Sequence, residues 1–138
     1  MSRLFVDTSA FAALADKNDD NYARAVSFNQ QMQGRILVST NYVLDELHTL
    51  LLLNAGYPKA VSFKTKLDVL MAKRLLRIVW VSEAIAQDAW DIFERFNTDK
   101  QWSFTDCTSY VVMKQHRLTE VFTFDHHFSQ MGFTRLPF

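Results

Sequence analysis

Four short, mainly apolar runs alternate with longer segments of helical character, and this alternation restricts the chain to a small set of folds. The runs cover residues 3–7, 35–40, 77–81 and 121–124, and each is too short to be a helix. The apolar residues of the first run are consecutive, so both of its faces are expected to be buried, as in a parallel sheet under helices. The sequence therefore predicts a three-layer α/β/α sandwich with a small parallel sheet, to which residues 133–138 could add an edge strand.

The segments between these runs are predicted to be helices. Glycine and proline are scarce, at 3 and 2 residues, which favours helices over a turn-rich all-β fold. Gly34 is a typical helix stop and Pro58 a typical helix start. The predicted helices cover residues 10–15, 22–33, 42–55, 58–71, 82–97 and 103–117.

The bulk composition indicates one packed domain. A length of 138 residues with 49% apolar residues predicts a single core over residues 1–138. The single cysteine excludes an internal disulfide and a cysteine-rich zinc site, and it suits a reducing, cytoplasmic location. The first residues do not read as a signal peptide, and the longest apolar run, residues 50–53, is too short to span a bilayer. No membrane association is therefore expected.

The charges balance overall but are unevenly distributed. The chain has 15 basic and 15 acidic residues, so net charge gives no indication of nucleic-acid binding. The charged side chains of residues 59–77 are mainly basic, and those of residues 83–99 are mainly acidic. Both stretches could simply be solvated helix faces, but the basic stretch could also contact the backbone of a polyanion such as RNA. The candidate contact residues are Lys59, Lys64, Lys66, Lys73 and Arg74.

Four acidic residues are expected to meet at one edge of the predicted sheet. Asp7 and Asp125 end the first and fourth strands, while Asp106 lies in the first turn of its helix and Glu46 about one turn into another. In an open parallel sheet, strand ends and the following helix starts share one edge. Each acid also has an ordinary structural interpretation: Asp7 as a helix N-cap, Asp106 as part of a capping box with Ser103, and Asp125 as a turn residue.

Carboxylates that converge in this way need a cation among them. They repel one another, and at least one would take up a proton unless a cation is bound. Hard oxygen ligands without thiolate suit Mg²⁺ or Mn²⁺. Such an ion can activate a water molecule and stabilise charge on an attacked phosphorus. The set therefore predicts phosphodiester hydrolysis without a covalent intermediate.

With these motifs, the sequence resembles the PIN-domain family of ribonucleases, most closely the VapC-type toxins of prokaryotic toxin–antitoxin pairs. The matching pieces are FVDTSAF, LDELHTLL, SFTDCTSYVVM and VFTFDHHF, in the family's order and approximate spacing. The resemblance implies a PIN-like fold and an Mg²⁺- or Mn²⁺-dependent endoribonuclease. It also implies a homodimer that is silenced by an antitoxin whose tail plugs the acidic pocket.

The resemblance also assigns roles to individual residues. It implies that Asp7, Glu46, Asp106 and Asp125 form the metal-binding and catalytic quartet and that Ser9 helps to orient the site. Other residues were interpreted from the sequence alone. The pair His126-His127 is interpreted as surface or phosphate-proximal rather than as metal ligands. Cys107 is interpreted as a small buried residue. Trp80, Trp90 and Trp102 are interpreted as core or interface residues rather than as platforms for a base, and Trp102, in a loop before the site, is the one whose position would suit stacking.

Two other functions remain open at this point. A phosphotransferase could use Asp7 as a phosphate acceptor, but Ser9 stands where the usual Asp-x-Asp pair needs its second acid. A non-catalytic PIN-like module that binds RNA or protein is the other alternative, and the complete acidic quartet argues against it. The motifs of P-loop enzymes and zinc hydrolases are absent from the sequence.

Overall fold

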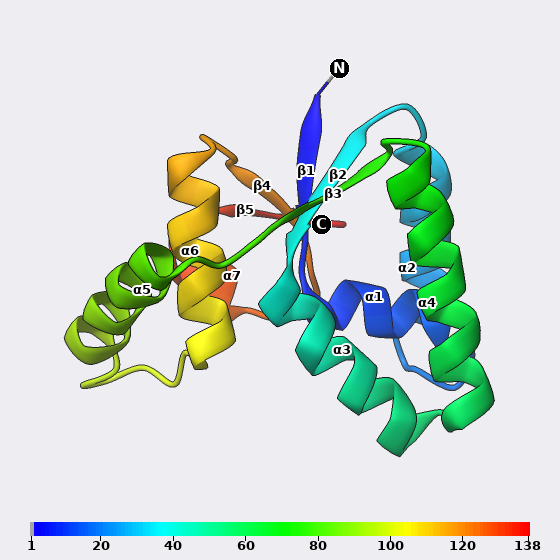
Figure 1. Cartoon of the computed structure of the whole chain (residues 1–138), viewed down its shortest axis with the longest axis horizontal. Helices are drawn as coiled ribbons and strands as arrows, with labels where there is room; N and C mark the ends of the chain where they lie inside the picture. Colours follow the sequence, from blue (N-terminus) through cyan, green and yellow to red (C-terminus); the bar gives the residue numbers. More distant parts are fainter. Residues whose placement is uncertain (1) are drawn as a thin grey trace.

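The computed structural model describes residues 2–138 and contains one five-stranded sheet in which every pairing is parallel (Figure 1). The strand order is β3-β2-β1-β4-β5, which places β1 at the centre. The predicted parallel sheet is confirmed, and the predicted edge strand forms as β5. The strands are β1 (Arg3–Val6), β2 (Ile36–Thr40), β3 (Leu76–Val79), β4 (Glu120–Phe122) and β5 (Thr134–Leu136).

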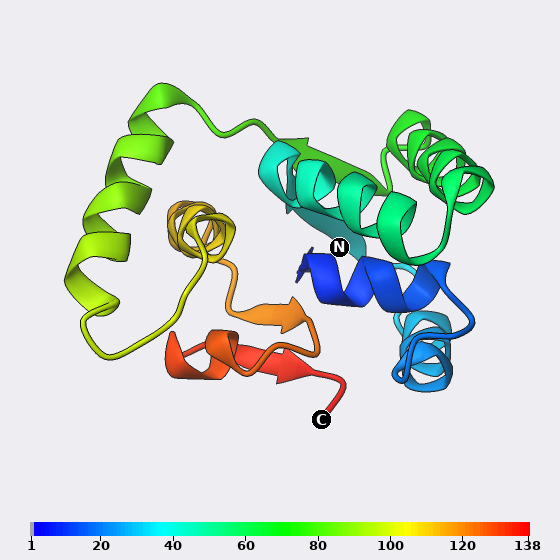
Figure 2. The same cartoon turned by 90° about the horizontal axis from the view of Figure 1, so that it is seen from below.

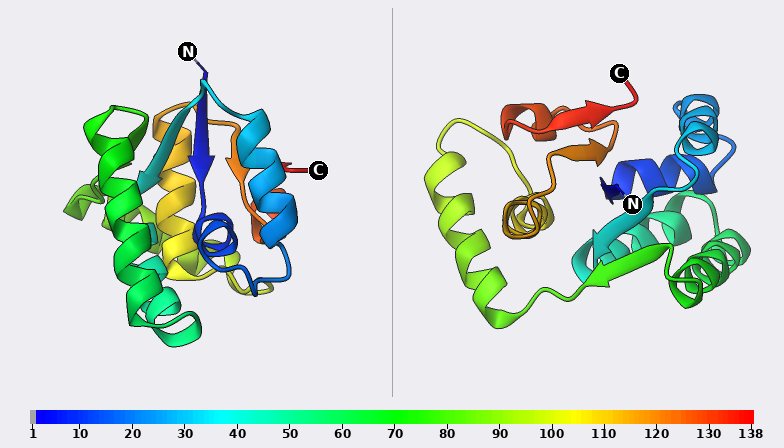
Figure 3. Two further views of the ribbon diagram at one scale, coloured as in Figure 1. Left: turned by 90° about the vertical axis from the view of Figure 1, so that its right-hand side faces the viewer. Right: turned by 90° about the horizontal axis from the view of Figure 1, so that it is seen from above.

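Helices lie on both faces of this sheet and complete the predicted three layers (Figures 2 and 3). In both figures α1, α2 and α4 lie on one side and α5 and α6 on the other, while α3 contacts α1, α4 and α6. None of these described helices is both long and apolar enough to cross a membrane. The helices are α1 (Thr8–Ala15), α2 (Tyr22–Gln31), α3 (Asn41–Asn54), α4 (Tyr57–Ala72), α5 (Glu83–Phe96), α6 (Phe104–Gln115) and α7 (His127–Gln130).

The buried core explains why the first strand carries consecutive apolar residues. Leu4, Phe5 and Val6 are fully buried, because helices cover both faces of the central strand. Cys107 is also buried, as predicted, and burial raises the pKa of its thiol to about 12. The core interpretation holds for Trp102: its ring is buried and stacks on Phe96, so it is not accessible to a base.

The strand order creates a crevice between β1 and β4. The chain adds β2 and β3 on one side of β1 and then crosses over to place β4 and β5 on the other side. In open parallel sheets, ligands bind beyond the carboxyl ends of the strands at such a switch point. The amide of Asp7, just after β1, donates to the Phe122 carbonyl at the end of β4, with an N···O distance of 3.0 Å. The two strand ends that carry predicted acids are therefore neighbours.

Three strands end earlier than the sequence suggested, β1 by a single residue, and one short helix was not predicted. β3 stops at Val79, and the amide of Val81 donates instead to Asn41 Oδ1 at 2.6 Å, which leaves Trp80 exposed. β4 stops before Thr123, where the chain turns toward the predicted site. The unpredicted helix α7 begins only two residues after Asp125 and so folds the following side chains back over the sheet edge.

Candidate active site

The four predicted acids line one cavity at the carboxyl edge of the sheet. It has a volume of about 260 Å³, and Ser9 and His127 line it as well. Each acid comes from a different part of the fold: the β1–α1 junction, α3, the first turn of α6 and the loop after β4. The residues that the sequence analysis grouped through sheet topology are thus brought together by the structure. The carboxylates are those of Asp7, Glu46, Asp106 and Asp125.

Asp7 is the most buried of the four acids. It caps α1, and its Oδ2 accepts hydrogen bonds from the hydroxyls of Ser9 at 3.0 Å and Thr123 at 2.8 Å. The pKa of Asp7 is raised to about 7, mainly by burial and also by the neighbouring charge of Asp106, while the two hydroxyls oppose the shift. The predicted N-cap role is confirmed, but capping alone does not require such deep burial of a carboxylate among other acids.

The hydroxyls of Ser9 and Thr123 connect Asp7 to the loop after β4. The Ser9 hydroxyl accepts from the amide of Phe124 at 2.9 Å, and the Thr123 hydroxyl accepts from the amide of Asp125 at 3.0 Å. Both hydroxyls also donate to Asp7, so they hold the loop and the acid in one arrangement. The resemblance implied that Ser9 helps to orient the site, and these hydrogen bonds are consistent with that role. Thr123 was not predicted.

Asp106 is fixed at the start of α6 by the predicted capping box. Its Oδ2 accepts from the amide of Ser103 at 3.1 Å, and its own amide donates to the Ser103 hydroxyl at 3.0 Å. Burial raises the pKa of Asp106 above its usual value, and a hydrogen bond from His127 opposes this shift. The capping box leaves the Asp106 carboxylate buried in the cavity. The same side chain can therefore both cap the helix and contribute to a metal site.

Glu46, rather than its neighbour Asp45, lines the cavity, as the helix phase predicted. Asp45 is exposed and does not line the cavity, whereas Glu46 is half-buried. Burial raises the pKa of Glu46 above its usual value, and the charges of Asp106 and Asp125 raise it as well. The same direction of shift at three carboxylates shows that the protein alone does not neutralise this cluster.

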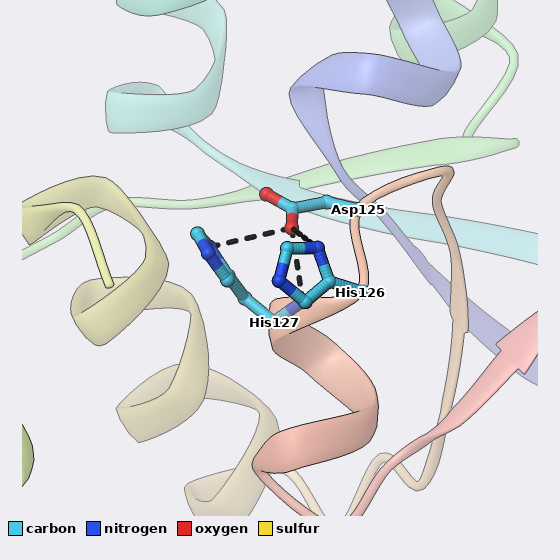
Figure 4. Close-up of side chains that lie close together, drawn as sticks. All are labelled: Asp125, His126 and His127. Carbon is cyan, nitrogen blue, oxygen red and sulfur yellow. Dashed lines mark hydrogen bonds and ion pairs between the residues drawn. The ribbon is translucent and has the colours of Figure 1, made fainter. Parts of the chain in front are cut away.

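The two adjacent histidines both lie beside Asp125 but differ in their exposure and contacts (Figure 4). The side chain of His126 is 70% exposed, but that of His127 is only 19% exposed. His127 Nδ1 lies 3.0 Å from Asp106 Oδ2 and 3.3 Å from Asp125 Oδ1, while the His127 amide donates to the same Asp125 oxygen at 2.9 Å. The surface interpretation thus describes His126, whereas His127 is part of the acidic cavity. Ligand atoms of Asp125, His126 and His127 also lie within 4.8 Å of one another.

The predicted basic contact residues lie outside the acidic cavity. They belong to α4 and the turn after it, and none of them lines the cavity. Lys64 is paired with Asp68 at 2.6 Å, and Lys73 and Arg74 immediately precede β3, at the amino edge of the sheet opposite the acids. The start of α4, which carries Lys59, lies on the side of the carboxyl edge (Figure 1). An RNA contact by this set remains a prediction.

The donors in the cavity fit a hard divalent cation. The four carboxylates supply oxygen ligands and no thiolate, which is the chemistry that Mg²⁺ and Mn²⁺ prefer. In addition, the Thr8 hydroxyl is buried at the cavity beside the Glu46 carboxylate, where it opposes the rise in the pKa of Glu46. It has no other described partner, so it is available to a water molecule of a hydrated ion. Asp7, Asp106, Glu46 and Asp125 are the residues that would hold such an ion.

Comparison with known proteins agrees with this geometry. A family model described as "PIN domain" matches residues 4–134. The 23S rRNA-specific endonuclease VapC20 of Mycobacterium tuberculosis is 29% identical over 133 residues, covering 96% of this chain and 97% of that protein. A VapC ribonuclease of Archaeoglobus fulgidus is 29% identical over 128 residues, covering 90% of this chain and 78% of that protein.

Solved structures show the same fold. The crystal structure of M. tuberculosis VapC20, described as a sarcin-ricin loop cleaving toxin, superposes with a TM-score of 0.85 at 28% identity and covers 95% of this chain and 96% of that one. FitAcB from Neisseria gonorrhoeae superposes with a TM-score of 0.70 at 20% identity and covers 96% of this chain and 95% of that one. The second likeness concerns the fold alone.

Proposed function

This chain belongs to the PIN domain family, and from that premise we propose that it is a metal-dependent endoribonuclease and the toxin of a toxin–antitoxin pair. The relatives that match nearly its whole length are RNA-cleaving VapC proteins. The reaction is hydrolysis of an RNA phosphodiester bond. Because one relative acts on 23S rRNA, that RNA is the first substrate to test. Because the proposed substrate is RNA, the proposed site of action is the cytoplasm.

One observation carries this proposal: four carboxylates from four separate elements share a cavity of about 260 Å³. Burial raises the pKa of three of them, so their assembly opposes the stability of the metal-free protein. Folds keep such unfavourable clusters at functional sites. A divalent cation and an RNA phosphate would together supply the charges that make the cluster favourable.

The chain's own residues orient this cluster for chemistry. A bound Mg²⁺ or Mn²⁺ would supply Lewis acidity and lower the pKa of a water molecule. Ser9 and Thr123 hold Asp7 through hydroxyl hydrogen bonds, and the Ser103 capping box holds Asp106. His127 lies between Asp106 and Asp125 and restricts both carboxylates. The depth of Asp7 keeps bulk water away from one side of the site.

The proposed protein partners are an antitoxin and a second copy of this chain, with which it would form a homodimer. The acidic cavity is complementary to a cationic side chain, so an antitoxin segment that enters it is expected to carry lysine or arginine. Large apolar side chains are exposed around the α3–α4 turn, which supports a subunit interface there. They are Leu52, Leu53, Tyr57 and Val61, of which Leu53 is 74% and Tyr57 70% exposed.

The test is cleavage of an RNA mixture that includes 23S rRNA, with Mg²⁺, Mn²⁺ or a chelator. Asp7→Asn, purified in the same way, controls for contaminating nuclease and preserves the size of the side chain. Cleavage that needs the metal and is lost in Asp7→Asn would support the proposal. A folded protein that neither cuts RNA nor binds Mn²⁺ would instead favour the non-catalytic binding module.

A further inference from the structure

A second cavity, of about 550 Å³, lies on the other side of the loop that follows β4. It is lined by residues from the start of α2, from that loop, and from β5 and the residues after it. Thr123 belongs to the wall of this cavity, and its hydroxyl donates to Asp7 in the acidic cavity. The two cavities are therefore neighbours, separated by residues 123–127. A volume of this size is in the range of roughly 300–1,000 Å³ that ligand sites occupy.

The charge of this cavity is opposite to that of the acidic one. Among the described residues that line it, the charged side chains are Arg24 and Arg135, and none is acidic. Neither arginine is paired with a described Asp or Glu side chain. Arg135 Nε donates to Ser129 Oγ at 2.6 Å and Arg24 Nη2 to the Phe138 carbonyl at 3.3 Å. Each guanidinium carries five donors, so both retain donors for an anion.

Aromatic rings line the same cavity. The Arg24 guanidinium lies over the ring of Phe124, 5.4 Å from its centroid, and Phe133 and Phe138 also contribute to the wall. The amide of Phe124 faces the acidic side, where it donates to Ser9, while its ring faces the basic cavity. Proteins use arginine beside aromatic rings to bind single-stranded nucleic acid: the guanidinium contacts a phosphate, and the ring stacks on a base.

We infer that this cavity binds a nucleotide of the RNA substrate adjacent to the phosphodiester that is cut. Arg24 and Arg135 contact its phosphate, and Phe124 stacks on its base. The inference rests on the proposed endoribonuclease function, because the scissile phosphate is placed at the acidic cluster on the other side of the loop. In this arrangement the hydroxyls of Ser9 and Thr123 connect the two sites through the loop backbone.

The experiment measures binding of a fluorescein-labelled, random-sequence 12-nucleotide single-stranded RNA by anisotropy, in the Asp7→Asn background with chelator. Arg24→Gln with Arg135→Gln is expected to weaken the Kd tenfold or more. The double variant should also flatten the salt dependence of log Kd by roughly 0.7, the contribution of one neutralised phosphate on a single strand. The matched control is Arg95→Gln with Arg117→Gln, two exposed arginines that do not line the cavity; its Kd should change less than threefold.

A third variant separates stacking from charge. Phe124→Leu should weaken RNA binding severalfold and leave the salt dependence as it was, because it removes a ring and no charge. Melting curves of all variants identify any that fail to fold. The inference would be overturned if the Arg24→Gln/Arg135→Gln variant and the control variant bound RNA with equal affinity. Unchanged RNA binding with lost binding of a labelled hexaglutamate peptide would also overturn it and assign the cavity to an acidic protein partner.

Cleavage by the same arginine variants in the wild-type background distinguishes this inference from the proposed function. Wild-type cleavage with arginine variants that match the control would leave the nuclease function standing and reject the nucleotide site. RNA binding that depends on both arginines, in a protein that cleaves no RNA, would support the nucleotide site and reject the nuclease function.

Discussion

His127 Nδ1 lies 3.0 Å from Asp106 Oδ2, so a residue of the four-residue helix α7 holds the acid of the capping box at the start of the much longer helix α6. The same ring nitrogen lies 3.3 Å from Asp125 Oδ1. His127 therefore connects Asp106 and Asp125, the last two of the four cavity acids in the sequence. Groups that orient metal-binding carboxylates in this way act on the metal site without any requirement to touch the substrate.

Replacing His127 with alanine is expected to reduce both Mn²⁺ affinity and RNA cleavage by roughly 10- to 100-fold, the usual effect of losing an orienting partner. Isothermal titration with Mn²⁺ and single-turnover cleavage measure the two quantities. His126→Ala is the matched control, since the His126 side chain is 70% exposed and lies farther from Asp125, at 3.8 Å. Equal losses in the two variants would contradict a specific role for His127.

The raised pKa of Asp7 makes the metal-free protein less stable as pH rises. The pKa is about 7 in the folded protein, against an ordinary value of 3.8 for an unburied aspartate. Between these values the folded state binds more protons than the unfolded state, so the free energy of unfolding falls as pH increases and levels off above about pH 7. The loss is on the order of 4 kcal/mol, because each pKa unit is worth about 1.4 kcal/mol. Urea unfolding between pH 4 and pH 8, with chelator present, measures it.

Asp7→Asn should remove most of this dependence, because an amide carries no titrating proton. At pH 8 without metal, the variant is expected to be more stable than the wild type, although it lacks the proposed activity. Glu46 and Asp106 shift in the same direction, so a smaller slope of the same sign should remain. A variant that is less stable than the wild type at pH 8 would contradict the burial argument for Asp7.

Divalent metal should reverse the instability at neutral and higher pH. An ion that binds only the folded state stabilises it by about 2.7 kcal/mol at a concentration one hundred times its Kd. Mn²⁺ is therefore expected to raise the Tm of the wild type at pH 8, and a chelator should abolish the increase. Asp7→Asn with Asp106→Asn should show little increase, and an equal increase in this double variant would place the ion elsewhere.

The sequence was sufficient to place three of the acids because each lies next to a signal that can be read locally. Asp7 and Asp125 follow strands, and Asp106 forms a capping box with Ser103. Parallel strand order then forces these positions to one edge. Glu46 needed one further step, the phase of the apolar residues on α3, which distinguished it from Asp45.

The parts that could not be predicted depend on short elements and on tertiary packing. α7 has only four residues, so no periodicity indicated that His127 turns back toward Asp106. Arg24 and Arg135 meet because β5 joins the sheet edge near the start of α2, and no local pattern links residues so distant in the chain. The sequence left base stacking by Trp102 open, because its position in a loop gives no sign that its ring stacks in the core.

The basic residues of α4 give a graded prediction for RNA binding. Lys59 and Lys66 are exposed, and the α4 end that carries Lys59 lies on the side of the acidic edge, whereas Lys73 and Arg74 lie at the opposite edge. Lys59→Glu with Lys66→Glu should therefore weaken RNA binding and flatten its salt dependence more than Lys73→Glu with Arg74→Glu. Anisotropy titrations at several salt concentrations compare the two pairs. Wild-type affinity in both would reject the α4 contact.

Leu53 tests the proposed subunit interface. Its side chain is 74% exposed beside other apolar residues of the α3–α4 turn, and a charge there would be desolvated in any interface that covers the turn. Leu53→Glu is expected to convert a homodimer to a monomer in sedimentation velocity, with little change in Tm measured where the wild type is also monomeric. Trp90→Glu, at an exposed aromatic residue on the distant helix α5, is the matched control. A monomeric wild type, or a dimer that persists in Leu53→Glu as in the wild type, would remove the α3–α4 turn as the interface.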